Sequence, residues 1–322
     1  MKKITKNLGM AIALTIASTA SAQTTWNMAT PYPEAEFHTQ NINKFIDDVS
    51  ELTKDELKIV VHSGQSLFKH PEIRRAVRTG QVQAGEIMMA NLANEDEMYA
   101  VDSIPFLIEG YNSAKVLWDA QRPFVEKRMK DDGLVLLYAV PWPGQGFFTN
   151  KKINDISDMA GVSFRTYNSM TAEMASLMDA TPTTVEAVEI PQAFSTGVVD
   201  AMVTSAATGH RTEAWQFSEY YYDLQAWMPK NMIFVNNRAF ESLPKEHRQA
   251  VLEAAKAAEV RGWELSKSIF DESTKELGKK MTVLEPSEKF SQQLQELGRT
   301  MAEKWVQEVG SDGQVVLDAL EQ

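Results

Sequence analysis

The stretch Asp158-Met-Ala-Gly-Val-Ser-Phe-Arg-Thr-Tyr-Asn168 predicts a strand that runs straight into a helix. The residues after Gly161 are β-branched or aromatic at alternate positions, which is typical of a short strand. Asn168 then offers an N-cap for the helical pattern that follows. Arg165 is therefore expected at the carboxyl end of a strand, where open α/β sheets bind their ligands.

Arg165 has two interpretations at this point. Its guanidinium stays protonated, and its planar fork matches a carboxylate with two parallel hydrogen bonds. It could thus receive the acid group of a small ligand, or it could form a structural ion pair. The residue alone does not separate these alternatives.

The first 22 residues predict a secretory signal peptide. A basic start, Met1–Lys6, precedes a short apolar run and the small residues Ala20-Ser-Ala22. Such a run is too short to span a bilayer. We expect cleavage near Ala22 and an exported, periplasmic chain that begins near Gln23.

Charge and cysteine content exclude several classes of function. The chain has a net charge of −12 and no cysteine. An acidic surface argues against nucleic acid and anionic lipid as partners. The absence of cysteine excludes disulfides, thiolate metal ligands and cysteine nucleophiles. Because the acidic surface repels anions in general, a site for an anion must consist of a few hydrogen-bond donors that point at the ligand.

Strand and helix patterns alternate along the chain and predict two α/β lobes. In the first lobe the order βαβαβ indicates parallel strands, followed by a continuous apolar run typical of a strand buried on both faces. These segments are strands 25–30, 57–62, 84–90 and 133–140 and helices 37–52, 72–79 and 113–128. Pro141–Gly146 interrupts the pattern, and we place the first crossing between the lobes there.

The second lobe repeats the alternation, and the chain then returns to the first. The expected elements are 161–178, 183–190, 192–197 and 199–204, a returning strand 231–236, a long helix 244–279 and a terminal helix 287–308. The long helix exceeds the usual globular length, so we expect it to span both lobes. The predicted division is 23–146 plus about 234–260 for lobe I, and 147–233 plus about 261–322 for lobe II.

Four stretches together resemble the extracytoplasmic solute receptors of tripartite ATP-independent periplasmic (TRAP) transporters. They follow one another in the family's order and cover nearly the whole chain after residue 22. They are Asp102-Ser-Ile-Pro-Phe-Leu107 with Tyr111, Phe148-Thr-Asn150 with Ile156-x-Asp-Met-x-Gly161-x-x-x-Arg165, Phe194-Ser-Thr-Gly-Val-Val-Asp200, and Phe240-Glu-Ser-Leu-Pro244 before an Ala-rich helix.

The resemblance implies a two-lobe periplasmic binding protein fold of type II-like architecture, with one long helix spanning both lobes. It implies hinge closure on one small organic acid, no catalysis and no cofactor, and delivery of the acid to the membrane permease subunits. The family's carboxylate-clamping arginine falls on Arg165. A homodimer stays open beside a monomer, because some relatives of this family dimerise through the long helix.

Two departures from the family pattern bear on the ligand. Gly146 stands where the family often has a second arginine, and Thr204 stands where it has an asparagine. A second carboxylate would lose its partner. We therefore favour a monocarboxylate, such as a sugar acid or an aromatic or 2-oxo acid, over a C4-dicarboxylate. The missing side chain at Gly146 is expected to leave room for the ligand body.

Further cleft residues are expected at strand ends and at the crossing between the lobes. Each also has a structural alternative, such as packing or a solvated side chain. The set comprises the aromatic residues Trp142 and Trp227, the amide Gln145, the hydroxyls of Thr204 and Ser205, and Tyr32, Phe68, Lys69 and Asn91 in the first lobe. His70 also follows the second strand at an end that faces the cleft, with loop packing as its alternative. Glu86 lies in an apolar strand and needs a partner, so it is either half-exposed or paired with an arginine.

The sequence offers little for an enzyme. Its five histidines show no metal-ligand spacing, and there is no nucleophile elbow, phosphate loop or dinucleotide fingerprint. We predict no catalytic residue, no metal-binding residue and no cofactor, and the sequence leaves open whether a metal ion accompanies the ligand. The alternatives are a receptor for an ATP-driven (ABC) importer, which the long helix after Pro244 disfavours, and a periplasmic hydrolase.

Overall fold

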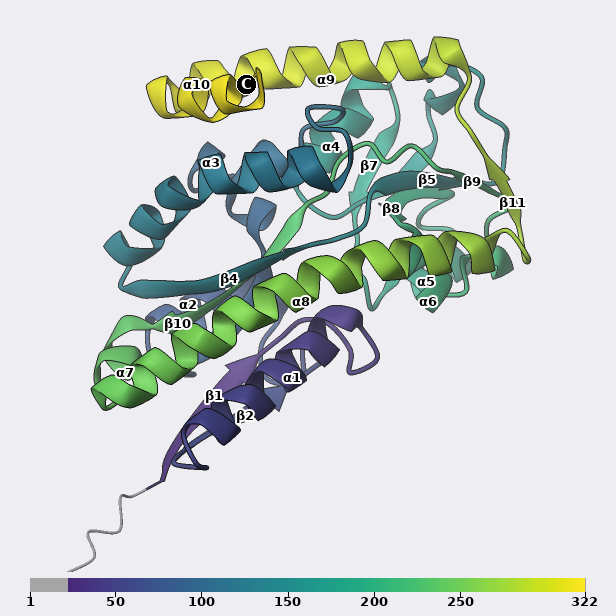
Figure 1. The fold of residues 1–322 in the computed structure, drawn as a ribbon. Coiled ribbons are helices and arrows are strands. Elements are labelled where there is room, and N and C mark those ends of the chain that lie inside the picture. The colour runs from purple at the N-terminus through teal and green to yellow at the C-terminus, as the bar shows by residue number, and fades with distance from the viewer. Residues whose placement is uncertain (1–22, 322) are drawn as a thin grey trace, which may run out of the picture.

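The computed structural model describes residues 23–321, in which the strands form two separate sheets. Figure 1 shows one sheet in each half of the molecule. The first has the order β2-β1-β3-β10-β4 and the second the order β11-β9-β5-β8-β6-β7. This arrangement confirms the two-lobe α/β prediction. The predicted signal peptide, residues 1–22, lies outside the described residues.

The first sheet is mixed rather than wholly parallel. Its strands are β1 (Thr24–Ala29), β2 (Leu57–His62), β3 (Ala84–Met88), β4 (Leu134–Pro141) and β10 (Lys230–Asn236). β1 pairs in parallel with β2 and β3, as the βαβαβ pattern predicts. β10 enters between β3 and β4 and runs antiparallel to both. The returning strand thus lies inside the sheet and joins β4 to it.

The second sheet carries two strands that the pattern did not indicate. Its strands are β5 (Gln145–Thr149), β6 (Ser163–Thr166), β7 (Thr181–Thr184), β8 (Ala201–Ser205), β9 (Tyr220–Tyr222) and β11 (Thr282–Leu284). β6 is parallel to β7 and β8, whereas β5 is antiparallel to β8 and β9. The two missed strands, β9 and β11, have three residues each, too few to show an alternating pattern.

The predicted helices occur in the expected order, and three short helices, α6 (Ala206–Arg211), α7 (Asn237–Glu241) and α10 (Ser311–Asp318), were not predicted. The others are α1 (Phe37–Leu52), α2 (His70–Arg78), α3 (Gly110–Asp131), α4 (Ser169–Leu177), α5 (Ile190–Ser195), α8 (Lys245–Leu277) and α9 (Glu288–Val309). No helix in the described part of the chain combines the length and the apolar character that a bilayer crossing needs.

Helix α8 spans both halves, as predicted (Figure 1). It packs against α1 and β4 on one side of the molecule and against α6 and β11 on the other. Its buried positions include Ala254, Ala258, Gly262 and Ser266, which are all small. Small side chains bring the helix axis close to its neighbours, which keeps one straight element in contact with both sheets.

Two crossing segments, 142–145 and 226–229, connect the halves and bond to each other. The N–H of Trp142 donates to the carbonyl of Pro229 (2.8 Å), and the N–H of Gln145 donates to that of Trp227 (3.0 Å). The N–H of Ala226 returns a bond to the Gln145 carbonyl (3.0 Å). The first crossing lies where Pro141–Gly146 predicted it. Helix α8 also joins the halves.

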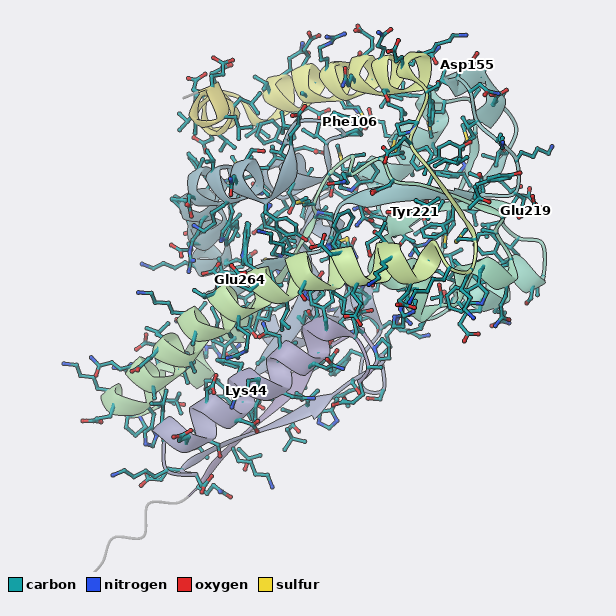
Figure 2. The ribbon with its side chains drawn as sticks, turned by 45° about the vertical axis from the view of Figure 1, so that its right-hand side comes forward. Lys44, Phe106, Asp155, Glu219, Tyr221 and Glu264 are labelled. Carbon is teal, nitrogen blue, oxygen red and sulfur yellow. The ribbon has the colours of Figure 1, made fainter. Side chains whose placement is uncertain are left out.

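Helix α9 contacts elements of both halves. Its Trp305 donates through Nε1 to the carbonyl of Glu97 (2.6 Å), and its Phe290 packs on the ring of Phe147 from β5. Phe106 lies beneath this helix (Figure 2). Its N–H donates to the carbonyl of Ala226 (2.6 Å). The residues at which the two lobes divide stay a prediction.

Candidate ligand-binding cavity

A small cavity of about 30 Å³ lies between the two sheets, beside the crossing segments. The first half contributes Tyr32, His70, Met88 and Asn91, the first crossing contributes Trp142 and Gln145, and the second half contributes Arg165, Tyr167, Glu186, Ala187, Thr204, Ser205 and Thr208. Seven of the ten predicted site residues thus come together. Because residues from both halves line one small space, its shape depends on how the halves meet.

Arg165 is oriented by backbone carbonyls. Its side chain is buried, with Nε donating to the carbonyl of Val185 (2.9 Å) and Nη1 to that of Val203 (3.0 Å). Over residues 23–321 the structure shows no salt bridge of Arg165 and no hydrogen bond from Nη2. The structural ion pair that the sequence left open is therefore not formed by any described residue.

The buried charge of Arg165 favours an anion in the cavity. Burial lowers the pKa of Arg165 to about 10, and nearby Tyr167 and Glu186 act in the opposite direction. The group is still protonated at neutral pH. A buried cation without a paired anion is costly, so an acid that reaches Nη2 would relieve that cost.

Tyr167 lies over Arg165 and is held by two predicted residues. The guanidinium carbon is 5.1 Å from the ring centroid. Trp227 donates through Nε1 to the Tyr167 hydroxyl (2.9 Å), which donates to Oε1 of Gln145 (3.2 Å). Nε2 of Gln145 donates to the carbonyl of Pro143 (2.8 Å). Gln145 lines the cavity with its amide already bonded, and Trp227 lies behind Tyr167 rather than in the lining.

Sequence reasoning missed Tyr167, although it belongs to the stretch that singled out Arg165. Side chains two apart on a strand share a face, and Tyr167 is two residues beyond Arg165 at the end of β6. This spacing was the available signal. It indicates an aromatic ring beside the guanidinium.

Two aromatic rings from the first half and its crossing segment form another wall. Tyr32 and Trp142 meet edge to face, with centroids 5.1 Å apart. The Tyr32 hydroxyl (3.2 Å) and Trp142 Nε1 (2.8 Å) both donate to Oδ1 of Asn231 on β10. Both rings are therefore fixed in orientation by one amide. This strand residue was not among the predicted site residues because its partners are about 90 and 200 positions away.

Glu86 supports that amide from beneath, and both alternatives predicted for it are wrong. Its side chain is fully buried, and it accepts hydrogen bonds from Asn231 Nδ2 (2.8 Å) and from the hydroxyl of Thr30 rather than from an arginine. Burial raises the pKa of Glu86 to about 7, while these two hydrogen bonds lower it.

His70 and Glu186 close the cavity on the side where the halves face each other. The Met88 N–H donates to Nε2 of His70 (3.1 Å), which leaves the proton on Nδ1. Nδ1 then donates to Oε2 of Glu186 (3.1 Å) across the cleft. His70 therefore lines the cavity rather than merely packing in a loop. A second bond between the halves, from Arg211 Nε to Glu36 Oε2 (2.8 Å), lies outside the cavity lining.

Three predicted residues do not line this cavity. Trp227 is described above. Phe68 is half-buried and packs on the core beneath the first sheet. Lys69 has an exposed side chain at the start of α2, and its N–H donates to Oε2 of Glu72 (3.0 Å). Lys69 is thus no second cation for a ligand in this cavity.

The prediction that Gly146 leaves room for the ligand body is wrong. A Cβ placed there would lie 2.3 Å from the carbonyl oxygen of Tyr222 and 2.7 Å from the ring of Tyr221. The position faces β9, not the cavity, so the absent side chain makes no room for a ligand. Thr204 and Ser205, by contrast, do line the cavity. Ser205 also accepts a bond from the N–H of Thr208 (3.2 Å) as the N-cap of α6.

The described residues offer no group of three or more His, Asp or Glu side chains that could hold a metal ion. What the cavity does combine is one guanidinium, one carboxylate, several hydroxyls and two aromatic walls. Such a set can bind and orient a small polar acid.

Comparison with known proteins agrees with the sequence resemblance. The family described as bacterial extracellular solute-binding protein, family 7, matches residues 28–308. The chain is similar to the Bordetella pertussis extracytoplasmic solute receptor DctP7, which binds pyroglutamic acid, at 44% identity and a TM-score of 0.91, over 93% of this chain and 100% of that one.

Two further solved receptors are similar over the same extent. DctP6 of Bordetella pertussis, which also binds pyroglutamic acid, is 41% identical with a TM-score of 0.91, over 92% of this chain and 99% of that one. A TRAP solute-binding protein from a marine metagenome, in complex with co-purified pyroglutamate, is 36% identical with a TM-score of 0.91, over 93% and 99% of the two chains.

Proposed function

Because this chain belongs to the bacterial extracellular solute-binding proteins of family 7, we propose that it captures pyroglutamate or a closely similar small monocarboxylate. The similar solved chains are TRAP solute receptors, so the protein is a substrate-binding receptor and not an enzyme. Members of such systems work in the periplasm. The proposed partner of the loaded receptor is the membrane permease of its TRAP transporter.

The observation that carries this proposal is the lone buried guanidinium of Arg165. Among the described residues that line the cavity, it is the one Lys or Arg side chain. One fixed cation matches one carboxylate, which disfavours a C4-dicarboxylate. The identities of 36–44% to receptors that bind pyroglutamate support that acid ahead of the sugar, aromatic and 2-oxo acids.

Export is part of the same proposal. We propose that residues 1–22 direct the chain to the periplasm and are removed near Ala22. N-terminal sequencing or intact-mass measurement of protein recovered from the periplasm tests this step. A mass that still includes residues 1–22 would contradict it.

The test of ligand class is thermal unfolding with a panel of acids. Mature protein is unfolded and refolded first, which removes any ligand carried over from the cell. The panel contains pyroglutamate, glucuronate, a 2-oxo acid and succinate. A ligand at about one hundred times its dissociation constant stabilises the folded state by roughly 2.7 kcal/mol. We expect the largest shift with pyroglutamate, whereas a shift with succinate alone would overturn the monocarboxylate assignment.

A further inference from the structure

Glu186 places a second charged group on the cavity wall directly beside Arg165. The carbonyl that receives Arg165 Nε belongs to Val185, the preceding residue. Arg165 and Thr183 are also opposite each other in the pairing of β6 with β7. Arg165 on β6 and Glu186, in the segment that follows β7, therefore reach the cavity side by side, so one small ligand can contact both.

The two oxygens of Glu186 have different surroundings. Oε2 receives the hydrogen bond from His70 Nδ1 at 3.1 Å. Oε1 has no hydrogen-bond partner within the described part of the chain. His70 cannot serve both oxygens, because its other ring nitrogen accepts the N–H of Met88. One oxygen of this cavity-lining, partly exposed carboxylate is thus left without a donor from the described residues.

The carboxylate is ionised at neutral pH. Burial acts to raise the pKa of Glu186, but the hydrogen bond and electrostatic interaction with His70 and the positive charges of Arg165 and Lys69 outweigh it and hold the pKa below the usual value. An ionised carboxylate only accepts hydrogen bonds. It repels the carboxylate of a plain acid and is satisfied by a ligand that carries an N–H.

We infer that Glu186 Oε1 accepts a hydrogen bond from a ligand N–H close to the carboxylate that Arg165 binds. Glu186 would then select acids with such an N–H, as in a cyclic amide, over acids of equal shape that lack it. This inference rests on the proposed function and names its specificity-determining residue. A site built to bond a ligand N–H rejects the analogue without it, because the acceptor in the closed site is left unpaired when that analogue binds.

The test compares pyroglutamate with the corresponding lactone acid, 5-oxotetrahydrofuran-2-carboxylate. The lactone keeps the ring, the carbonyl and the carboxylate but replaces the ring N–H by oxygen. Calorimetric titration of the refolded wild-type protein should favour pyroglutamate on the order of a hundredfold or more. Equal affinities would overturn the role of Glu186 and leave the proposed function intact. If neither acid binds, the proposed function itself fails.

Two variants identify Glu186 as the selecting group. In Glu186→Gln, His70 Nδ1 holds the amide oxygen, so the amide NH₂ meets the ligand N–H. A Gln side chain could still turn its amide oxygen toward the ligand, whereas Glu186→Leu removes the acceptor in every orientation. Both should reduce the preference for pyroglutamate at least tenfold. If both variants weaken the two acids by the same factor, Glu186 acts only in holding the halves together, and the inference is wrong.

Arg211→Gln supplies the matched control. Arg211 bonds Glu36 across the same two halves but does not line the cavity. Its loss should weaken both acids equally, because closure is affected while the ligand contacts are not. A changed preference in this variant would show that selectivity follows closure rather than Glu186, and would overturn the inference.

Discussion

At the residue scale, Arg165 differs from a structural arginine in the partners that hold it. Backbone carbonyls of Val185 and Val203 fix the direction of the guanidinium without neutralising its charge. Tyr167 supports it from the side. The positive charge is thus oriented in advance, and a bound acid would supply the missing anion.

Replacement of Arg165 should abolish most of the binding. We expect Arg165→Ala to lose roughly 2–5 kcal/mol of binding free energy to pyroglutamate, because a buried, hydrogen-bonded charge partner is removed. Arg165→Lys should also bind poorly, since the two-pronged geometry is lost. Calorimetric titration measures both, with Lys58→Ala, an exposed cation on β2 outside the cavity, as the control. Unchanged affinity in Arg165→Ala would refute the assignment.

Glu86 should make the stability of the protein depend on pH. Its pKa in the folded protein is about 7, against an ordinary value of 4.5. The folded state holds the proton of Glu86 more tightly than the unfolded state. The resulting contribution to the free energy of unfolding is therefore fully present below about pH 4.5 and is lost as the pH rises through about 7.

Glu86→Gln replaces the protonated form by a neutral group of the same shape. Relative to wild type, the variant should therefore become more stable by on the order of 3 kcal/mol between pH 4.5 and pH 8. Chemical denaturation at several pH values measures the difference. A difference in stability that stays constant with pH would show that Glu86 does not titrate in this range.

At the element scale, helix α9 packs so closely on the backbone of Pro105 that Gly298 has no room for a side chain. A Cβ on Gly298 would lie 2.0 Å from the carbonyl oxygen of Pro105. The neighbouring Phe106 lies under the same helix (Figure 2). Because the contact is with backbone, a side-chain rotation cannot relieve it.

Gly298→Ala should therefore destabilise the protein, although alanine favours a helix by about 1 kcal/mol over glycine. Overpacking costs roughly 1–3 kcal/mol or more, and we expect a net loss in the free energy of unfolding. Denaturant titration measures it, with Gln295→Ala on the exposed face of α9 as the control. A gain in stability in Gly298→Ala would mean that α9 does not press on Pro105 in solution.

At the scale of the whole molecule, the two crossing segments and helices α8 and α9 join the halves, and hydrogen bonds also cross the cleft. The crossing segments are bonded to each other, and α8 touches both sheets. The bonds His70–Glu186 and Arg211–Glu36 form only when the halves meet. A ligand that contacts both halves adds free energy to the closed arrangement alone.

Ligand binding should consequently make the molecule more compact. We expect the radius of gyration from small-angle X-ray scattering to fall when pyroglutamate is added to refolded wild-type protein. Arg165→Ala at the same ligand concentration should show no change. An identical radius with and without ligand in the wild type would indicate a preformed closed cavity rather than hinge closure.

The sequence by itself determined the order and nature of most elements. Helices α1 and α8, strands β1, β2 and β4, and the crossing near Pro141 follow from periodicity, apolar runs and proline placement. These signals are local, because each reports which face of one element is buried. Arg165 was found in the same way, since the end of a strand is a local feature.

Only the tertiary structure decided which polar side chains meet. Asn231 bonds Tyr32 and Trp142, and His70 bonds Glu186 from 116 positions away. Antiparallel β10 lies between β3 and β4, and Gly146 faces β9 rather than the cavity. Hydrogen-bond partners of this kind depend on how distant elements pack. A local pattern can show that a buried polar group needs a partner, but the fold selects which one it has.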